Sequence, residues 1–146
     1  MEINTSRFGP IRIDQDDILR FPAGILGLEE CCDWILLGDT QNPAVAWLQS
    51  VERPRVALAV VSPRRFVPDF RMRVVRAELE PLELDDLSDA HVLVIVGKTE
   101  RGITLNLKAP LVIHPARRLG RQVITNGELP LRHELTNGPP ALKRTA

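Results

Sequence analysis

The side chains best suited to covalent or metal chemistry are two cysteines and three histidines. Cys31 and Cys32 are adjacent, and side chains at neighbouring positions rarely meet the geometry of an unstrained disulfide. His91, His114 and His133 show no ligand spacing such as His-x-x-x-His. We therefore interpret the cysteines as residues at the edge of the core, and we expect no metal site and no cofactor.

Other catalytic motifs are missing from the sequence. A nucleophilic serine is often marked by a Gly-x-Ser-x-Gly turn, and none is present. The Gly24–Gly27 segment lacks the Lys-Ser or Lys-Thr that ends a phosphate-binding loop. The acidic pair Asp85-Asp86 occupies adjacent positions, which on a strand point to opposite faces. We expect no enzyme and no small-molecule substrate; the alternative is a small barrel enzyme or thiol-dependent protein that uses Cys31 or Cys32.

Short β-prone runs separated by Pro, Gly, Asn and Asp dominate the chain, and few windows show the 3.6-residue period of a helix. About ten short strands at this spacing predict a mainly β fold, a small closed or nearly closed barrel-like single domain. We expect turns at Gly9-Pro10 and one or two short helical turns, at 29–32 and 82–87. The predicted strands cover residues 2–8, 11–13, 17–21, 34–37, 45–51, 56–61, 70–74, 91–96, 103–107, 111–114 and 122–125.

The length and hydropathy of the chain predict the number of domains and the location of the protein in the cell. A chain of 146 residues is the size of one domain. We assign residues 1–135 to the barrel domain and residues 136–146, which carry little apolar surface, to a flexible C-terminal tail. No apolar run approaches the roughly 20 residues that span a bilayer, and the first residues lack the apolar block of a signal peptide. We expect a cytoplasmic protein that does not bind membranes.

The charge balance bears on nucleic-acid binding. The chain has 19 basic and 19 acidic residues, whereas nucleic-acid binders usually carry a positive surplus. Single-strand binders also stack bases on exposed rings, and this chain has four Phe, two Trp and no Tyr. Trp34 and Trp47 lie in apolar runs and are expected in the core. Direct nucleic-acid binding is disfavoured, and an RNA-binding barrel is kept as a further alternative.

Five segments resemble the FliW family of flagellar assembly factors. Their order along the chain and the coverage from Glu2 to Leu135 make the resemblance specific. The five segments are Thr5–Gly9, Phe21–Glu29, Trp47–Ser50, Thr104–Pro110 and Gly120–Ile124.

The resemblance implies a small β-barrel-like protein without enzymatic activity and with two protein partners, flagellin and the translational regulator CsrA. Abundant flagellin would occupy the protein and leave CsrA free to repress flagellin messenger RNA. After flagellin is exported, the released protein would bind CsrA and relieve the repression. RNA would then be affected only through CsrA, which suits the neutral charge of the chain.

Three groups of residues are candidates for partner contacts. Polar side chains inside or at the end of apolar runs can either satisfy nearby backbone or offer a donor to a partner. The 63–70 loop offers aromatic and proline side chains as a rigid apolar contact. The acidic stretch Glu78–Asp89 is either a solvated face or a surface for a basic partner such as CsrA. The candidates are Gln49, Ser50 and Asn106; Phe66, Pro68, Asp69 and Phe70; and Glu83, Asp85 and Asp86.

Overall fold

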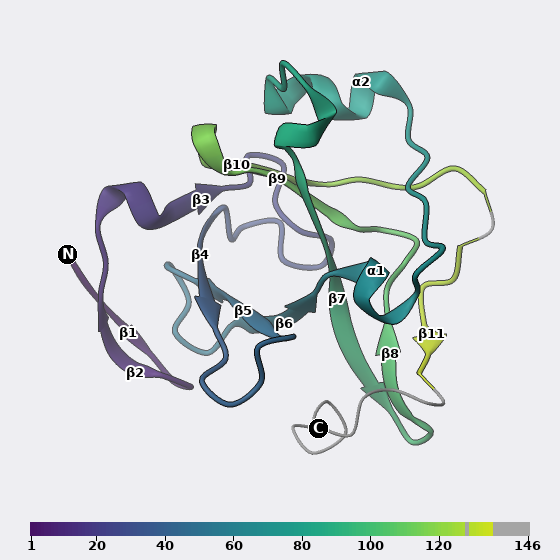
Figure 1. Ribbon diagram of the computed structural model, residues 1–146. Helices are drawn as coiled ribbons and strands as arrows, with labels where there is room; N and C mark the ends of the chain where they lie inside the picture. The colour runs from purple at the N-terminus through teal and green to yellow at the C-terminus, as the bar shows by residue number, and fades with distance from the viewer. Residues whose placement is uncertain (128, 136–146) are drawn as a thin grey trace.

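The structure is a computed structural model that describes residues 1–127 and 129–135 (Figure 1). The predicted flexible tail, 136–146, lies outside the described residues. The strands are β1 Glu2–Thr5, β2 Gly9–Arg12, β3 Ile18–Arg20, β4 Asp33–Gly38, β5 Ala46–Ser50, β6 Ala57–Val61, β7 His91–Thr99, β8 Gly102–Leu105, β9 Leu111–His114, β10 Leu119–Gln122 and β11 His133–Glu134. The helical turns are η1 Gln15–Asp17, α1 Pro63–Phe66, α2 Arg76–Leu79, η2 Glu80–Leu82, η3 Leu87–Asp89 and η4 Pro115–Arg117.

Seven strands close into a barrel in the order β3, β4, β5, β6, β7, β9 and β10. Most neighbours are antiparallel, and β10 closes the ring by a parallel contact with β3, where Leu119 lies opposite Arg20. Each strand of the ring therefore has a neighbour on both sides, unlike the two end strands of an open sheet. The prediction of a mainly β, closed barrel with a few short helical turns is confirmed.

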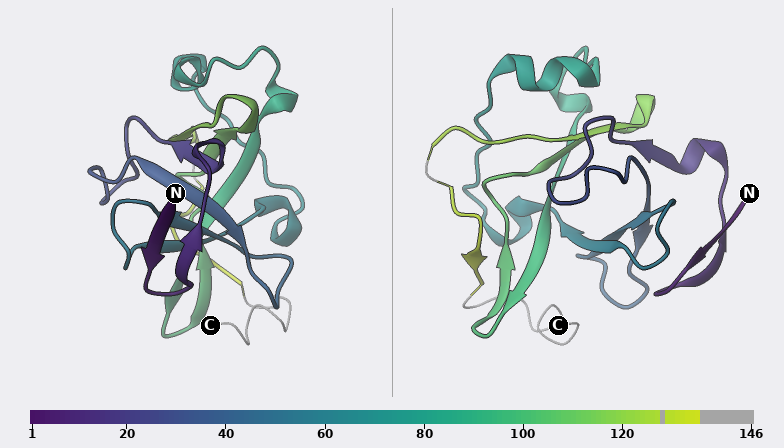
Figure 2. Two further views of the ribbon diagram at one scale, coloured as in Figure 1. Left: turned by 90° about the vertical axis from the view of Figure 1, so that its left-hand side faces the viewer. Right: turned by 180° about the vertical axis from the view of Figure 1, so that it is seen from behind.

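Two further pieces extend from the barrel wall. The hairpin β1–β2 is a separate two-stranded sheet beside the barrel, visible from both sides in Figures 1 and 2. Its Ile3 packs with Ile13 and with Ile35 of β4, so it covers the outer face of that strand. The long β7 pairs with β6 and β9 near its start and with β8 near its end, where the β7–β8 hairpin projects from the barrel.

The barrel interior is filled by large apolar side chains that alternate along the strands with outward-facing ones. Phe21, Trp34, Leu48, Val60 and Leu111 are fully buried and belong to one cluster. Burial of each such side chain contributes about 1.5–3 kcal/mol. This interior is packed, so function has to lie on the surface and at the ends of the barrel.

The first predicted turn is one of the points where the structure differs from the sequence-based assignment. Gly9-Pro10 belongs to β2, and the turn lies at residues 6–8. The Thr5 hydroxyl fixes it, because Oγ1 donates to the Gly9 carbonyl (2.8 Å) and accepts from the Phe8 amide (2.9 Å). Pro10 is tolerated because β1 and β2 form a two-stranded sheet in which both strands are edges.

The predicted strand at 70–74 is wrong, although its alternation correctly identified the inward side chains. Phe70 is buried and Met72 and Val74 are half-buried, but residues 70–75 form no ladder. The Arg73 carbonyl accepts one backbone bond, from the Asn126 amide (2.6 Å). The segment therefore packs as a strap over the outer clusters without joining the sheet.

Three further assignments need correction. The last strand of the ring spans 119–122, so the prediction at 122–125 is displaced. The Val123 amide still donates to the Pro110 carbonyl (3.0 Å). Because proline has no N–H, Pro110 cannot donate a bond to Val123, and the regular ladder ends there. Residues 29–30 form a turn and 31–32 have no regular structure, so there is no helix at 29–32. At 82–87 only the two end residues are helical, because η2 ends at Leu82 and η3 begins at Leu87.

Candidate functional site

Residues Glu78–Asp89, here called the acidic cap, lie with η2 and η3 against the outer face of β9 and β10, at the top of Figure 1. The cap is anchored by Leu82, which is 1% exposed and packs with Val112 and Val123. The buried His114 ring also holds it, since Nδ1 lies 2.8 Å from the Leu82 carbonyl. The contacts of Leu82 thus fix the position of a segment whose acidic side chains are mostly exposed to solvent.

Two of the carboxylates in the acidic cap are paired with arginines. Glu78 receives bonds from the Arg121 guanidinium, with Nη2 at 3.0 Å, and Glu83 lies 3.5 Å from Arg117. Hydrogen bonds from the backbone and side chain of Ser88 lower the pKa of Asp86, so this carboxylate remains charged. The cap therefore presents a negative field even though parts of it are neutralised.

A pocket of about 610 Å³ opens within the acidic cap. Its lining combines apolar side chains with three acidic residues and the basic Arg76, and it brings together two of the predicted contact residues, Glu83 and Asp85. Glu83 has φ +56 and ends η2 in a left-handed conformation. Asp86 does not line the pocket and instead caps η3 by accepting from the Ser88 amide (2.9 Å). A partner with a basic side chain next to an apolar one would match this lining.

The 63–70 loop exposes less aromatic surface than its sequence suggests. Phe70 is 5% exposed, and Phe66 is half-buried against the same outer cluster. The Arg64 side chain donates to the Phe70 carbonyl (3.2 Å) and holds the loop closed. Pro68 and Asp69 are exposed. Arg64 and Arg65 are exposed as well, so the loop surface is mainly polar and charged, and its role in binding stays a prediction.

The polar candidates on β5 and after β8 make backbone contacts. Gln49 is fully buried, and its Nε2 donates to the carbonyls of Ser50 (2.9 Å) and Pro54 (3.3 Å), which fixes the β5–β6 turn. Ser50 Oγ accepts from the Arg53 amide (3.0 Å). Asn106 is half-buried and accepts from the amide of residue 109 (3.0 Å). Each of the three side chains therefore hydrogen-bonds nearby backbone, which is one of the two roles expected for it. A contact with a partner stays a prediction.

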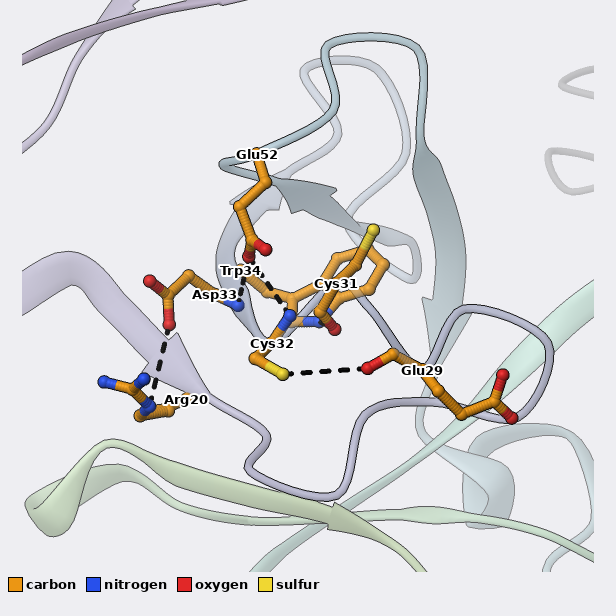
Figure 3. A network of polar contacts seen from close by, with 7 residues as sticks. All are labelled: Arg20, Glu29, Cys31, Cys32, Asp33, Trp34 and Glu52. Atoms are coloured by element: carbon orange, nitrogen blue, oxygen red, sulfur yellow. Dashed lines mark hydrogen bonds and ion pairs between the residues drawn. The ribbon is translucent and has the colours of Figure 1, made fainter.

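The cysteines lie in a polar network at the start of β4 (Figure 3). Cys31 is buried and its carbonyl accepts from the Trp34 indole N–H (3.0 Å). Cys32 is half-exposed, and its thiol lies 3.7 Å from the Glu29 carbonyl. The Glu52 carboxylate accepts the amides of Cys32 (3.1 Å) and the next residue (2.7 Å). This arrangement orders the backbone.

Two features are absent from residues 1–127 and 129–135, which the structure describes. No group of three or more His, Cys, Asp and Glu side chains there could hold a metal ion. No helix within the same residues is long and apolar enough to cross a membrane.

The sequence did not reveal a cluster of ring and charged side chains around Trp47. This tryptophan is half-buried and carries the Arg7 guanidinium carbon 4.0 Å from its ring centroid. Phe8 packs edge-on to it, with centroids 6.1 Å apart. The indole N–H donates to Asp39 (3.0 Å), and this bond is the main reason that the pKa of Asp39 is lowered. Trp47 packs against the apolar cluster of Val45 and Val61 but is only partly buried, so it lies at the edge of the core and also reaches the surface.

The five segments singled out in the sequence meet in two places. Thr5–Gly9 and Trp47–Ser50 come together at the Arg7–Trp47 contact. The other three meet around Gln122, whose Oε1 accepts from the Leu26 amide (2.8 Å) and whose Nε2 donates to the Ala109 carbonyl (3.1 Å). The motif residues thus build the fold and one surface cluster.

The sequence model of the family described as FliW protein matches residues 2–135. The flagellar assembly factor FliW of Natranaerobius thermophilus is 32% identical over 94% of this chain and 93% of its own length. The flagellar assembly factor FliW of Moorella thermoacetica is 36% identical over 92% of this chain and 88% of its length. A crystal structure of the flagellar assembly factor FliW superposes with a TM-score of 0.85 at 32% identity, covering 92% of this chain and 96% of that one. The chain belongs to the FliW family.

Proposed function

We propose that the protein is a cytoplasmic flagellar assembly factor without enzymatic activity that binds flagellin and CsrA in alternation. When flagellin is abundant it occupies the protein, and CsrA represses translation of flagellin messenger RNA. When flagellin has been exported, the protein binds CsrA and relieves that repression. Family membership supports this role, since the relatives named above are flagellar assembly factors.

The acidic cap is the observation that supports CsrA as a partner. CsrA binds RNA, and proteins that bind RNA carry positive charge to displace counterions from phosphate. The cap exposes Asp85 and Asp86 beside a pocket whose lining has more acidic than basic residues, and complementary charge steers association and fixes orientation. We assign Glu83, Asp85 and Asp86 to the CsrA contact.

Co-purification with each partner tests the function. Purified flagellin and purified CsrA should each form a stoichiometric complex with the protein, and an excess of one should displace the other. If neither protein binds, the proposed function is wrong. If both bind together without displacement, alternation is wrong although both partners are right.

Charge reversal tests the assignment of the surface. Glu83→Lys, Asp85→Lys and Asp86→Lys, combined in one variant, should weaken CsrA binding by at least about tenfold and leave the fold intact. The matched control is the same change of charge at Glu2, Glu30 and Glu100. These three side chains are exposed and lie outside the acidic cap, and Glu30, like Glu83, is paired with an arginine (2.9 Å to Arg53). Equal CsrA affinity in the two variants would remove the cap from the proposal.

A further inference from the structure

The barrel wall opens between β6 and β7. The ladder between these strands consists of two pairs, Val60 with Ile95 and Val61 with Val94. Residues 57–59 of β6 continue to pair with β5, whereas residues 96–99 of β7 pair with β8. The opening between 57–58 and 97–98 is here called the seam. In Figure 1 the β7–β8 hairpin diverges from β6 in this region.

Both margins of the seam carry backbone groups that point into it. The Val56 carbonyl accepts from the Ser50 amide (2.9 Å) across the β5–β6 pair. Because such groups alternate along an antiparallel strand, those of Ala57 face away from β5 and into the seam. On the other margin the Ile95 carbonyl accepts from Asn106 (3.0 Å), so the groups of Lys98 also face the seam. Ala57 and Lys98 have no ladder partner there among the described residues.

A groove of about 320 Å³ lies directly over the seam. Small residues, Ala57, Ala59 and Gly97, contribute to its lining, while Trp47 and Ile103 provide larger apolar side chains. Small side chains allow another backbone to approach closely. The groove continues the apolar cluster that α1 and the following loop cover farther along the strands. It therefore offers both backbone pairing and an apolar contact.

The charged residues of the groove indicate which partner it suits. Arg7 and Lys98 line it, and the acidic residue there, Asp39, already accepts the Trp47 indole N–H and two backbone amides. Such a lining disfavours a basic protein, and the acidic cap, the complementary surface for a basic protein, lies at the start of β7 while the seam lies toward its end. Of the two proposed partners, the seam therefore suits flagellin better than CsrA, which binds RNA.

We propose that an extended segment of flagellin docks in the seam as an added strand, an inference that rests on the proposed function. Its backbone pairs with Ala57 and Lys98, and a small apolar side chain enters the groove between Trp47 and Ile103. An acidic residue beside that side chain faces Lys98. This is recognition by strand addition, in which main-chain bonds give affinity and the groove selects alternate side chains.

Two variants and one control test the seam. Ala57→Pro removes an N–H that points into the seam and spares the bonds to β5, and Ala57→Arg places a long charged side chain in the groove. Each should weaken binding of purified flagellin by at least about tenfold and leave CsrA binding unchanged. The control, Ile124→Arg, changes a 48% exposed apolar side chain that does not line the groove and should bind flagellin as the unmodified protein does.

Hydrogen exchange on the unmodified protein keeps the test independent of variant folding. The amides of Ala57 and Lys98 should exchange rapidly in the free protein and become protected on adding flagellin, and CsrA should not protect them. Flagellin binding that leaves these amides unprotected, or that is undiminished in both folded Ala57 variants, overturns the seam and leaves the proposed function standing. A protein that binds no flagellin contradicts the proposed function itself. Protection in the free protein that disappears when residues 136–146 are deleted would make the tail the occupant and overturn the inference.

Discussion

Gly120 lies on β10, where the barrel wall passes over the ring of Phe21. A Cβ added at Gly120 would lie 2.3 Å from Cζ and 2.5 Å from Cε1 of Phe21. Carbon atoms attract one another best at about 3.5–4.0 Å, so the ring would have to retreat by more than about 1 Å. Phe21 is fully buried among Trp34 and Leu48, and the core offers it little room. Gly120→Ala should therefore be destabilising although alanine is a small residue.

The expected cost is that of an overpacked core, about 2 kcal/mol. For a chain of this length that lowers Tm by about 6 °C. Gly38→Ala is the matched control, because a Cβ there meets nothing within 4 Å and the residue has no positive φ. Alanine restricts the unfolded chain more than glycine, so the control should gain about 0.5 kcal/mol. The two substitutions are chemically identical and should change stability in opposite directions.

Thermal and urea unfolding of both variants, followed by circular dichroism, measures the difference. A double-mutant cycle with Phe21→Leu identifies the cause, since leucine lacks the ring atoms that the new methyl meets. Gly120→Ala should cost clearly less in the Phe21→Leu background than alone. If Gly120→Ala is as stable as the unmodified protein, or if its cost is the same in both backgrounds, the proposed steric clash is wrong.

Three other predictions concern two carboxylates, Asp39 and Glu52, and the exposure of the two cysteines. The lowered pKa of Asp39, caused first by the Trp47 hydrogen bond, means that its charged form stabilises the fold above the ordinary aspartate pKa. That contribution is lost as the pH falls through the lower folded value, so the Tm difference between the unmodified protein and Asp39→Asn should shrink between about pH 5 and pH 2. Glu52→Ala removes two backbone contacts and should cost about 1 kcal/mol in urea unfolding, with Glu52→Gln costing less. A thiol reagent should label half-exposed Cys32 in the native protein and buried Cys31 only on unfolding; rapid native labelling of both would contradict the burial.

Strands with dense apolar runs could be predicted from the sequence, and their pairing could not. The apolar run that begins at His91 was correctly predicted as a strand, β7, and its Val94 is fully buried. The parallel contact of Leu119 with Arg20 that closes the ring has no local signal. It depends on two short strands that are far apart in the sequence. The number of strands suggested a barrel, while the order of its strands required the structure.

The candidate surface was predicted unevenly for a related reason. Acidic residues on a loop-rich segment are exposed almost regardless of fold, so Asp85 and Asp86 were placed on the surface correctly. Aromatic residues have no such default, and Phe70 proved to be buried while Trp47 proved to be half-exposed. The seam could not be predicted, because it depends on where two strands stop pairing.

Closure of the ring through β3 and β10 also determines when the fold can become complete during synthesis. The strands β3 to β7 emerge first and can pair in chain order, but β3 keeps an unpaired edge until β10 has been made. Contacts between distant parts of a chain form slowly because loop entropy must be lost first. The nascent protein therefore exposes the edge of β3 until nearly all of the ring has left the ribosome, and a chain truncated before Leu119 should expose that edge permanently and aggregate.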